Sequence, residues 1–421
     1  MPPADDRPHL LLISTGWREF REYLLRSIGP RYRVHLFLTA EPTWEHPYVD
    51  GWSVLDTLDR EALLAAASDL HARTPVDGVL CWDEPRILLA AEVAEALGLP
   101  GGDPGMVLRC RDKHLTREAL DAAGVPQPRS ALVRTPEEAL ERAAEFGFPV
   151  VLKPRALAGS LGIVAAATPA ELAERFAFIG ATQEALAPEA WRYEVPTLVE
   201  EFADGPEISV DAAVYGGHVH PFCLARKGLG FAPYFEEIGH VVEARDPLLR
   251  DSALTDLLQA THTALGFTDG VTHTEIRLTP TGPKIIEVNA RIGGGMIPYL
   301  GLRATGIDPG LAAAAVACGR PPDMTPDREL AGGVRFFYVS DDDTVIDSIG
   351  FDETGPLPAA VDQLVVLTQP GTTVSPPPKG NVFSRVAYAT AVAESVAECF
   401  TALDAAAAVL RVNAQALAPV T

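Results

Sequence analysis

Short apolar runs alternate with longer amphipathic segments along the amino-terminal part of the chain. The apolar runs, which we expect to be buried strands, are residues 9–14, 32–38 and 78–82. The segments with the apolar spacing of helices are residues 17–27, 60–72 and 86–97. Strands that alternate with helices form a parallel sheet covered on both faces. We therefore predict a parallel α/β domain over residues 1–105.

The middle of the chain is predicted to hold one helix and then a compact α+β unit. Residues 104–123 have the pattern of a single helix that Gly124 closes. Residues 128–204 mix short β-branched runs with helical patterns. Thr135 and Glu138 have the spacing of a capping box, which predicts the start of a helix there.

The composition shifts toward Pro, Gly and Asp from Pro321 onward. This tail alternates expected strands with one Ala- and Val-rich helix at residues 391–410. We predict a carboxy-terminal α+β domain over residues 321–421, in which we find no chemistry. Residues 106–320 are left as the region that carries the candidate site.

Two expected strands near residue 280 carry a candidate cation site. Residues 271–278 and 284–289 flank a Pro–Thr–Gly–Pro turn, so we predict a hairpin that brings Glu275 and Glu287 to one sheet. Two close carboxylates repel unless a cation lies between them, and Mg²⁺ prefers oxygen ligands together with substrate phosphates. The remaining polar residues on the same face are Asn289 and Arg291, whose planar fork suits a phosphate. An acidic hairpin with solvated tips is the alternative.

A cation next to a glycine- and serine-containing turn is a second candidate. Lys153 ends an expected strand, and Gly159, Ser160 and Gly162 lie in the loop that follows. Free backbone N–H groups beside one positive charge suit a phosphate, although the order of residues is not that of a P-loop. In isolation, a tight hairpin with an exposed lysine explains the pattern better. Lys113, on the expected helix, would alone be a solvated cation.

Several acids and one histidine could face a ligand. Glu207 begins an expected strand, and residues 226–237 form a Gly-rich, aromatic stretch that we interpret as an ordered functional loop ending near His240. Asp83 and Glu84 follow the third expected strand, where ligands of parallel sheets gather. A helix cap is an equally good explanation of these two acids, because Pro85 follows them.

Composition limits the class of partner. The chain has 421 residues, of which 47% are hydrophobic, and its formal net charge is −23. Such an acidic chain disfavours nucleic acid or an anionic membrane as a partner. The five cysteines are scattered and odd in number, so we expect reduced thiols and a cytoplasmic protein. We find no signal peptide and no apolar run long enough to span a bilayer.

Taken in order, these residues resemble the ATP-grasp enzymes, and the likeness extends over the whole chain. The elements that carry it are Arg111-Asp-Lys113, Val150-Val-Leu-Lys-Pro154, Gly159-Ser-Leu-Gly162, Val199-Glu-Glu-Phe202, Gly205-Pro-Glu207, Glu275 and Glu287-Val-Asn289-Ala-Arg291. The resemblance implies an α/β ATP-grasp fold with an amino-terminal parallel domain, a lid at about residues 128–204 and a small α+β tail.

The resemblance also implies roles for single residues. Lys113 and Lys153 would contact the phosphates of ATP, and the loop with Gly159, Ser160 and Gly162 would cover them. The adenine edge would meet Glu200, Glu201 and the backbone of Phe202 and Ala203, and Glu207 would meet the ribose. Glu275, Glu287 and Asn289 would hold Mg²⁺, with Mn²⁺ as an alternative, and Arg291 would stabilise the transferring phosphoryl group.

Within the family, the chain is most similar to the L-amino-acid ligases, which form dipeptides through an acyl phosphate. Glu237 followed by His240, and the Arg291-to-Met296 segment with Gly293, Gly294 and Gly295, carry this likeness. It implies that Glu237 pairs with the donor's α-ammonium and that His240 lies near the activated carboxylate. A structural histidine with a satisfied ring nitrogen is the alternative for His240.

The sequence also departs from the family pattern. The loop after Lys153 has few glycines for a phosphate lid, and three consecutive glycines predict an open pocket for the second substrate. We expect small-molecule substrates, an amino acid donor and an amine or peptide acceptor, with a homodimer as an open assembly state. A carboxylase that activates bicarbonate and a non-catalytic ATP sensor remain as alternatives.

Overall fold

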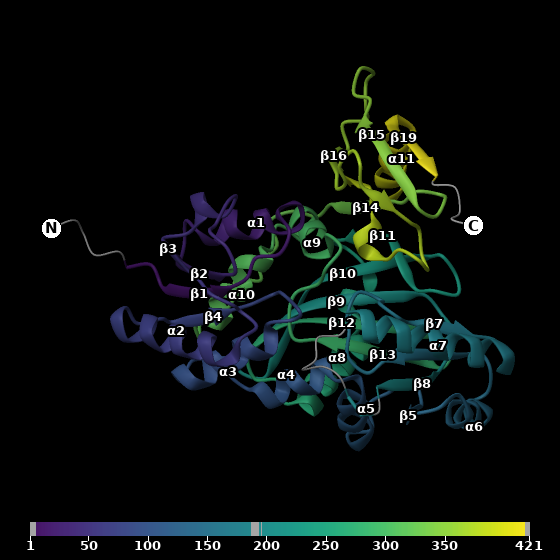
Figure 1. The fold of residues 1–421 in the computed structure, drawn as a ribbon. Coiled ribbons are helices and arrows are strands. Elements are labelled where there is room, and N and C mark those ends of the chain that lie inside the picture. The colour runs from purple at the N-terminus through teal and green to yellow at the C-terminus, as the bar shows by residue number, and fades with distance from the viewer. Residues whose placement is uncertain (1–5, 187–192, 195, 417–421) are drawn as a thin grey trace.

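The computed structural model describes residues 6–186, 193–194 and 196–416 (Figure 1). Its amino-terminal part is a four-stranded parallel sheet with strand order β3-β2-β1-β4. The strands are β1 (His9–Ile13), β2 (Arg33–Leu38), β3 (Gly51–Val54) and β4 (Gly78–Leu80), and the helices are α1 (Arg18–Ile28), α2 (Arg60–Arg73) and α3 (Ile87–Leu97). The predicted parallel α/β domain is therefore confirmed. β3 was not predicted, because it has polar or small residues at alternate positions and no buried apolar run.

The single helix predicted at residues 104–123 is wrong. The chain instead forms α4 (Pro104–Arg111) and α5 (Lys113–Ala122), with Asp112 extended between them. The Asp112 carboxylate accepts the N–H groups of His114 and Leu115, which caps a new helix. Arg155 also pairs with Asp112. The break places Lys113 at the first turn of α5, where it faces the site.

The predicted lid unit has its own sheet and its own apolar core. Its antiparallel strands are ordered β5-β8-β6-β7. The elements are β5 (Ser130–Val133), α6 (Pro136–Phe146), β6 (Val150–Pro154), β7 (Val164–Ala166), α7 (Pro169–Leu186) and β8 (Thr197–Glu201). The Thr135 hydroxyl accepts the Glu138 N–H, which confirms the predicted start of α6. Residues 187–192 and 195, inside the predicted lid range, lie outside the described residues.

A third, eight-stranded sheet forms the body of the molecule. Its order is β13-β12-β9-β10-β11-β14-β18-β16, and every neighbouring pair is antiparallel. The strands are β9 (Glu207–Tyr215), β10 (His218–Gly230), β11 (Glu236–Glu243), β12 (Gly270–Thr279), β13 (Gly282–Asn289), β14 (Ala331–Phe337), β16 (Val361–Val366) and β18 (Ala387–Ala393). The helices packed near it are α8 (Ser252–Leu265), α9 (Ile297–Thr305) and α10 (Pro309–Ala317). β14, β16 and β18 come from the tail, so the tail extends the sheet that carries the candidate site.

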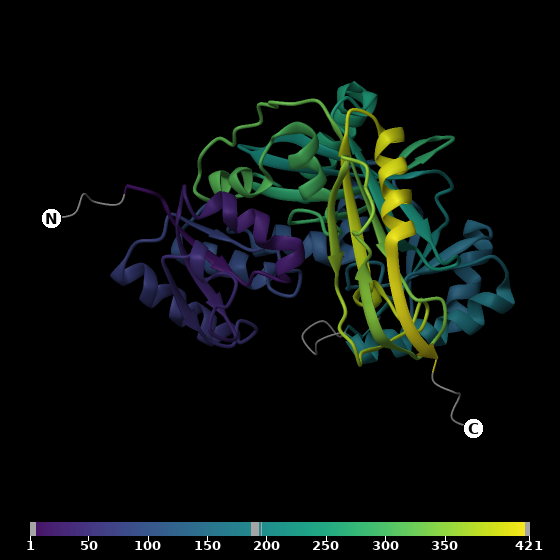
Figure 2. The ribbon, with the colours of Figure 1, turned by 90° about the horizontal axis from the view of Figure 1, so that it is seen from above.

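The rest of the tail forms a small sheet and a helix. The sheet has the order β17-β15-β19, with β15 (Thr344–Phe351), β17 (Thr373–Val374) and β19 (Leu410–Ala416). The helix predicted at residues 391–410 is shorter, because residues up to Ala393 belong to β18 and Ser395 caps α11 (Val396–Val409). Figure 2 shows α11 running alongside these strands. Short 3₁₀ turns occur at η1 (His46–Tyr48), η3 (Pro247–Arg250) and η4 (Val382–Ser384).

α10 joins the amino-terminal domain to the large sheet. It packs against β4 on one side and β12 on the other, and one apolar cluster includes Leu12, Ala213 and Leu300. Glu84, just after β4, pairs with Arg291, just after β13, so the carboxyl end of β4 faces the end of the β12–β13 hairpin. Ligands of parallel sheets usually bind at such carboxyl ends. All five cysteines are free thiols, as predicted. Among the described residues, no helix has both the length and the apolar character to cross a bilayer.

Candidate active site

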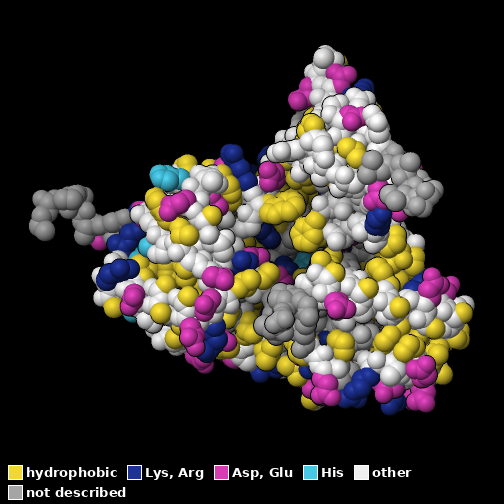
Figure 3. All heavy atoms as spheres, viewed as in Figure 1, with side chains coloured by type: hydrophobic (Ala, Val, Ile, Leu, Met, Phe, Trp, Pro, Cys, Tyr) yellow, Lys and Arg dark blue, Asp and Glu magenta, His cyan; other side chains and the backbone are white. Residues whose placement is uncertain are grey.

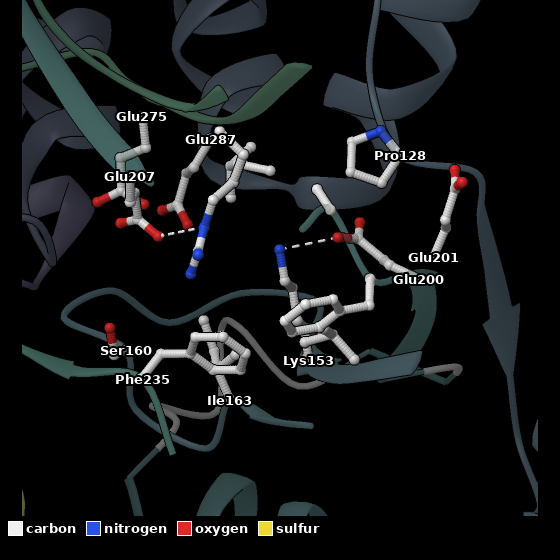
Figure 4. A pocket seen from close by; sticks show the side chains of 15 residues that line it. Pro128, Lys153, Ser160, Ile163, Glu200, Glu201, Glu207, Phe235, Glu275 and Glu287 are labelled. Carbon is white, nitrogen blue, oxygen red and sulfur yellow. Dashed lines mark ion pairs between the residues drawn. The ribbon is translucent and has the colours of Figure 1, made fainter. Parts of the chain in front are cut away.

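A cavity between the lid and the large sheet gathers many of the predicted residues (Figure 4). The predicted residues that line it are Lys153, Ser160, Glu200, Glu201, Phe202, Ala203, Glu207, Glu275 and Glu287. Apolar side chains such as Val151, Ile163 and Ile286 complete its wall. Figure 4 shows the carboxylates of Glu207, Glu275 and Glu287 together on one side, and Lys153 with Glu200 on the other. The cavity therefore has an acidic end and a cationic end.

The acidic end is built by the predicted hairpin. β12 and β13 pair with Glu275 directly opposite Glu287, as predicted. The Glu287 carboxylate lies 3.3 Å from the Lys113 ammonium. Glu275 instead faces Lys227 and His273, at 2.5 and 3.5 Å. Asn289 is buried at the end of β13. Two adjacent strands thus bring the three predicted metal ligands to one edge of the sheet.

Lys227, to which we assigned no role from sequence, lies among three of the predicted acids. Its ammonium is 3.0 Å from Glu207, 2.7 Å from Glu237 and 2.5 Å from Glu275. Burial opposes its charge, but the three carboxylates outweigh burial and raise the pKa of Lys227 well above its ordinary value. The expectation that residues 226–237 form a loop is wrong, because β10 continues to Gly230. A strand position aims Lys227 at its neighbours, and only residues 231–235 connect β10 to β11.

Glu237 and His240 lie together, as predicted, but Glu237 does not lack a cation. Lys227 contacts one of its oxygens, and His240 Nε2 is 3.3 Å from the other. Burial opposes ionisation of Glu237, but Lys227 and His240 outweigh burial and lower its pKa well below the usual range. In the described part of the chain, neither ring nitrogen of the buried His240 has a hydrogen bond of good geometry. This result disfavours a structural histidine with a satisfied nitrogen.

The tail supports this pair of residues from behind. Phe336 packs edge-on against the His240 ring, with ring centroids 5.8 Å apart. Arg385 donates a hydrogen bond to the Glu237 carbonyl and also pairs with Glu236. Burial is the main cause that lowers the pKa of His240 below its ordinary value, and the Glu237 carboxylate opposes this shift. The tail, in which we predicted no chemistry, therefore positions two predicted substrate residues.

The cationic end contains a buried network around Glu200. Its carboxylate is 2.8 Å from Lys153 and 2.8 Å from Arg117. Burial opposes ionisation, but the two cations outweigh it and lower the pKa of Glu200 to about 2. Both oxygens of the Glu200 side chain are thus used in ion pairs with Arg117 and Lys153. Only its backbone and its neighbours Glu201, Phe202 and Ala203 are left to face an adenine ring.

Glu207 and the loop after β6 also differ in detail from their expected roles. The two oxygens of Glu207 pair with Lys227 and Arg277, so a ribose hydroxyl would have to share this carboxylate. In the loop, the Lys113 ammonium donates a hydrogen bond to the Leu157 carbonyl. Gly162 has φ +74°, and an added Cβ would lie 2.9 Å from Pro154, so the turn requires glycine. Lys113 therefore holds the loop that carries Gly159 and Ser160.

Glu84 reaches the site, and Asp83 does not contact the same groups. The Glu84 carboxylate pairs with Arg291 at 2.5 Å and with Arg111 at 3.1 Å. Burial opposes its charge, and the two guanidinium groups outweigh burial and lower the pKa of Glu84. Asp83 instead accepts hydrogen bonds from Ser14 and Arg86. The amino-terminal domain thus orients the guanidinium that was predicted to meet the transferring phosphoryl group.

We had expected all three glycines, residues 293–295, to border an open pocket. This expectation is wrong for two of them. An added Cβ at Gly293 would lie 2.7 Å from His273, and one at Gly295 would lie 2.8 Å from His240. Only at Gly294 would an added Cβ meet nothing within 4 Å. Asp211 accepts the Gly293 N–H and pairs with His273. Burial opposes protonation of His273, but Asp211 outweighs burial and raises its pKa to about 9.

The space-filling view shows a hollow between the amino-terminal domain, the lid and the tail (Figure 3). Charged and histidine side chains lie inside it, and hydrophobic side chains surround the opening. The residues described above that sequence reasoning missed are Lys227, Arg117, Asp211 and His273. The available signal was the period of two along β9, β10 and β12, which places ionisable residues of three strands on one face. Without knowledge of which strands are neighbours, that signal does not identify partners.

Two family models match this chain. Residues 146–298 match the ATP-grasp domain, and residues 35–101 match the ATP-grasp N-terminal domain. The chain is 27% identical over 343 residues to alanine–anticapsin ligase of Bacillus subtilis, covering 77% of this chain and 70% of that protein. It is 28% identical over 289 residues to human carnosine synthase 1, covering 65% of this chain but 35% of that longer protein.

One solved structure has nearly the same extent. The L-amino acid ligase from Bacillus licheniformis superposes with a TM-score of 0.78 at 24% identity, covering 97% of this chain and 99% of that one. This likeness confirms the fold that the amino-acid sequence predicts. The superposed part of the chain includes the amino-terminal parallel domain, the lid and the tail.

Proposed function

The chain belongs to the ATP-grasp family, and we propose that it joins the carboxylate of one amino acid to the amine of a second amino acid, peptide or other amine. The donor carboxylate takes the γ-phosphoryl group of ATP, which forms an acyl phosphate and releases ADP. The acceptor nitrogen then attacks the acyl carbon, phosphate leaves, and the nitrogen loses a proton. The ligase names of the relatives support formation of a carbon–nitrogen bond.

One observation carries the proposal: a single described cavity has the Lys153 ammonium at one end and a cluster of acids at the other. Lys153 borders the space between the lid and the hairpin, and Glu275 and Glu287 lie across it. A nucleotide placed between them would bring its phosphates to Lys153 and Lys113. Glu237 adjoins Glu275 through their shared contact with Lys227. The donor site would therefore lie next to the phosphates.

The residues at the acidic end suit a divalent cation. The carboxylates there are Glu207, Glu237, Glu275 and Asp211, and the cations paired with them are Lys227, Arg277 and His273. Glu287, paired with Lys113, belongs to the same end, so five acids face four cations and the described cluster keeps an excess of negative charge. We propose that Glu275, Glu287 and Asn289 hold Mg²⁺ or Mn²⁺. The ion would neutralise negative charge on the phosphates while the γ-phosphoryl group is transferred.

The remaining roles follow from position. We propose that Glu237 binds the α-ammonium of the donor, with His240 beside the carboxylate that reacts. Arg291, oriented by Glu84, would stabilise the charge on the transferring phosphoryl group. A donor held at its α-ammonium and at its carboxylate is aligned for attack on the γ-phosphate of ATP. Such alignment lowers the activation barrier of the phosphoryl transfer.

We expect ADP release to require a donor and an acceptor together. Purified protein with ATP and Mg²⁺ would be screened against amino acids, singly and in pairs, with phosphate release and product mass as measurements. An amide product of the two amino acids is the expected result. Release that depends on bicarbonate and not on an amine would favour the carboxylase alternative. Binding of ATP without turnover under any pair would favour the sensor.

The lid is expected to respond to the nucleotide. β7 already contacts the loop between β10 and β11, where the Ala165 N–H donates to the Pro233 carbonyl. Lys113 now holds the Leu157 carbonyl, and phosphates would compete for the same ammonium. We predict that hydrogen exchange at residues 155–162 changes on addition of ATP and Mg²⁺ and slows once the loop covers the phosphates. Unchanged exchange with ATP demonstrably bound would contradict a phosphate-covering loop.

The cavity between the lid and the large sheet suits small-molecule substrates. A cytoplasmic location, a homodimer and the domain limits at residues 105 and 320 remain proposals. Gel filtration with light scattering would test the assembly state directly.

A further inference from the structure

Arg21 extends from the amino-terminal domain to the glycine turn of the site. It lies in α1, which begins shortly after β1 and shares an apolar cluster with the large sheet. Its two terminal nitrogens donate to the Gly293 carbonyl at 3.1 and 3.2 Å. A side chain of α1 therefore reaches the backbone of the glycine turn that contains Gly294.

Arg21 differs from the other arginines near it. Arg18 pairs with Glu22, Arg86 with Asp83, and Arg291 with Glu84. Within the described ranges, no carboxylate lies within ion-pairing distance of Arg21, and its one hydrogen-bond acceptor is a backbone oxygen. A guanidinium has five N–H donors, of which two are used here.

A partly buried guanidinium without an acid is costly, and this one also has a cationic neighbour. Burial is the main cause that lowers the pKa of Arg21; Tyr23 acts in the opposite sense, the nearby Arg291 lowers the pKa further, and Asp211 and Asp83 raise it. Such a group is stabilised when an anion joins it. On the same turn, an added Cβ at Gly294 would meet nothing within 4 Å, so the turn itself does not crowd a ligand there.

The span of the turn from Gly293 to Gly295 is similar to the length of one amino acid substrate. Gly293 accepts from Arg21, and Gly295 packs against His240. Two residues apart, their Cα atoms are separated by at most about 7.6 Å. A molecule whose amine approaches the activated carbon near His240 could therefore place a carboxylate a few bonds away against Arg21.

We propose that Arg21 binds the carboxylate of the acceptor, so that the acceptor is an amino acid or short peptide with a free carboxylate. The inference rests on the proposed ligase function, whose first step it does not affect. Arg21 selects the second substrate and leaves activation of the donor to Glu237, Arg291 and the metal site.

The test compares each acceptor amino acid with its own carboxamide. The wild-type protein should prefer the acid by about tenfold to a hundredfold in kcat/KM, the usual range for a charged hydrogen-bonded pair. Arg21→Gln should remove this preference by lowering kcat/KM for the acid alone. Arg21→Lys should retain part of it, because a point charge replaces the planar fork. Arg18→Gln, on the exposed side of the same helix, should behave as the wild type.

A purely structural role for Arg21 gives a different result. If Arg21 only holds the glycine turn, Arg21→Gln will lower kcat/KM for acid and amide equally, which overturns the proposal. Equal use of acid and amide by the wild-type protein overturns it as well. Arg21→Lys covers the case in which Arg21→Gln does not fold, because it keeps the positive charge and N–H donors on one nitrogen.

Hydroxylamine separates failure of this inference from failure of the ligase proposal. It attacks the acyl phosphate in place of the acceptor, forms a hydroxamate and releases phosphate, and it has no carboxylate. Arg21→Gln should form donor hydroxamate at the wild-type rate. Absence of hydroxamate with every donor in the wild-type protein would instead count against the ligase function itself.

Discussion

Replacing Glu287 by glutamine is expected to lower kcat by about a thousandfold, or roughly 4 kcal/mol of transition-state stabilisation. Glu287 lies opposite Glu275 on the hairpin and borders the cavity. The amide keeps the size of the side chain but is a poor ligand for a hard divalent cation. The measurement is phosphate release at saturating ATP over a range of magnesium concentrations.

The stability of this variant distinguishes a lost ligand from a damaged fold. Relief of the like charge opposite Glu275 favours this variant, whereas loss of the pair with the buried Lys113 disfavours it, so Glu287→Gln without metal should still unfold cooperatively, at or somewhat below the wild-type temperature. The rise in Tm that ATP and Mg²⁺ produce in the wild-type protein should be lost. Glu243→Gln, the same substitution on β11 beyond His240, should retain both the activity and the rise. Turnover close to wild type for Glu287→Gln would refute the metal assignment.

Local patterns predicted much of this fold. The apolar run of β1, the Thr135 cap and the turn after Thr279 each depend on residues close in sequence, and each was found as expected. The break at Asp112 was missed because the helical pattern continues through it. The competing term is a carboxylate that caps α5 and also binds Arg155, which is distant in sequence.

The same distinction between contacts that are local in sequence and contacts that are distant in sequence applies to the site. Glu275 and Glu287 could be paired from sequence, because only a short turn separates them. Lys227 could not be placed, because its three partners come from β9, β11 and β12, whose order in the sheet is a property of the whole fold. Glu84 remained undecided for the same reason, since its partner Arg291 is 207 residues away.

Donors acetylated on the α-nitrogen are expected to lose about a hundredfold or more in kcat/KM relative to the free amino acid. A site built to pair with an ammonium rejects an analogue without that charge, because its own polar groups are left unpaired. Lys227 already satisfies one oxygen of Glu237, so the donor ammonium would join an existing pair. The excess of acids over cations in the described cluster leaves charge for it.

Glu237→Gln should remove most of this discrimination and leave ATP binding nearly unchanged. The fold should survive, because Lys227 keeps Glu207 and Glu275 as partners. Glu243→Gln is the control, since Glu243 ends the same strand, β11, and the ion pairs described for Lys227 are with Glu207, Glu237 and Glu275. The experiment measures phosphate release with a free amino acid against its N-acetyl form in all three proteins. If the acetylated donor reacts as well as the free one, Glu237 does not bind an ammonium. The donor would then be a different carboxylic acid, and the acceptor would be the substrate that brings the amine.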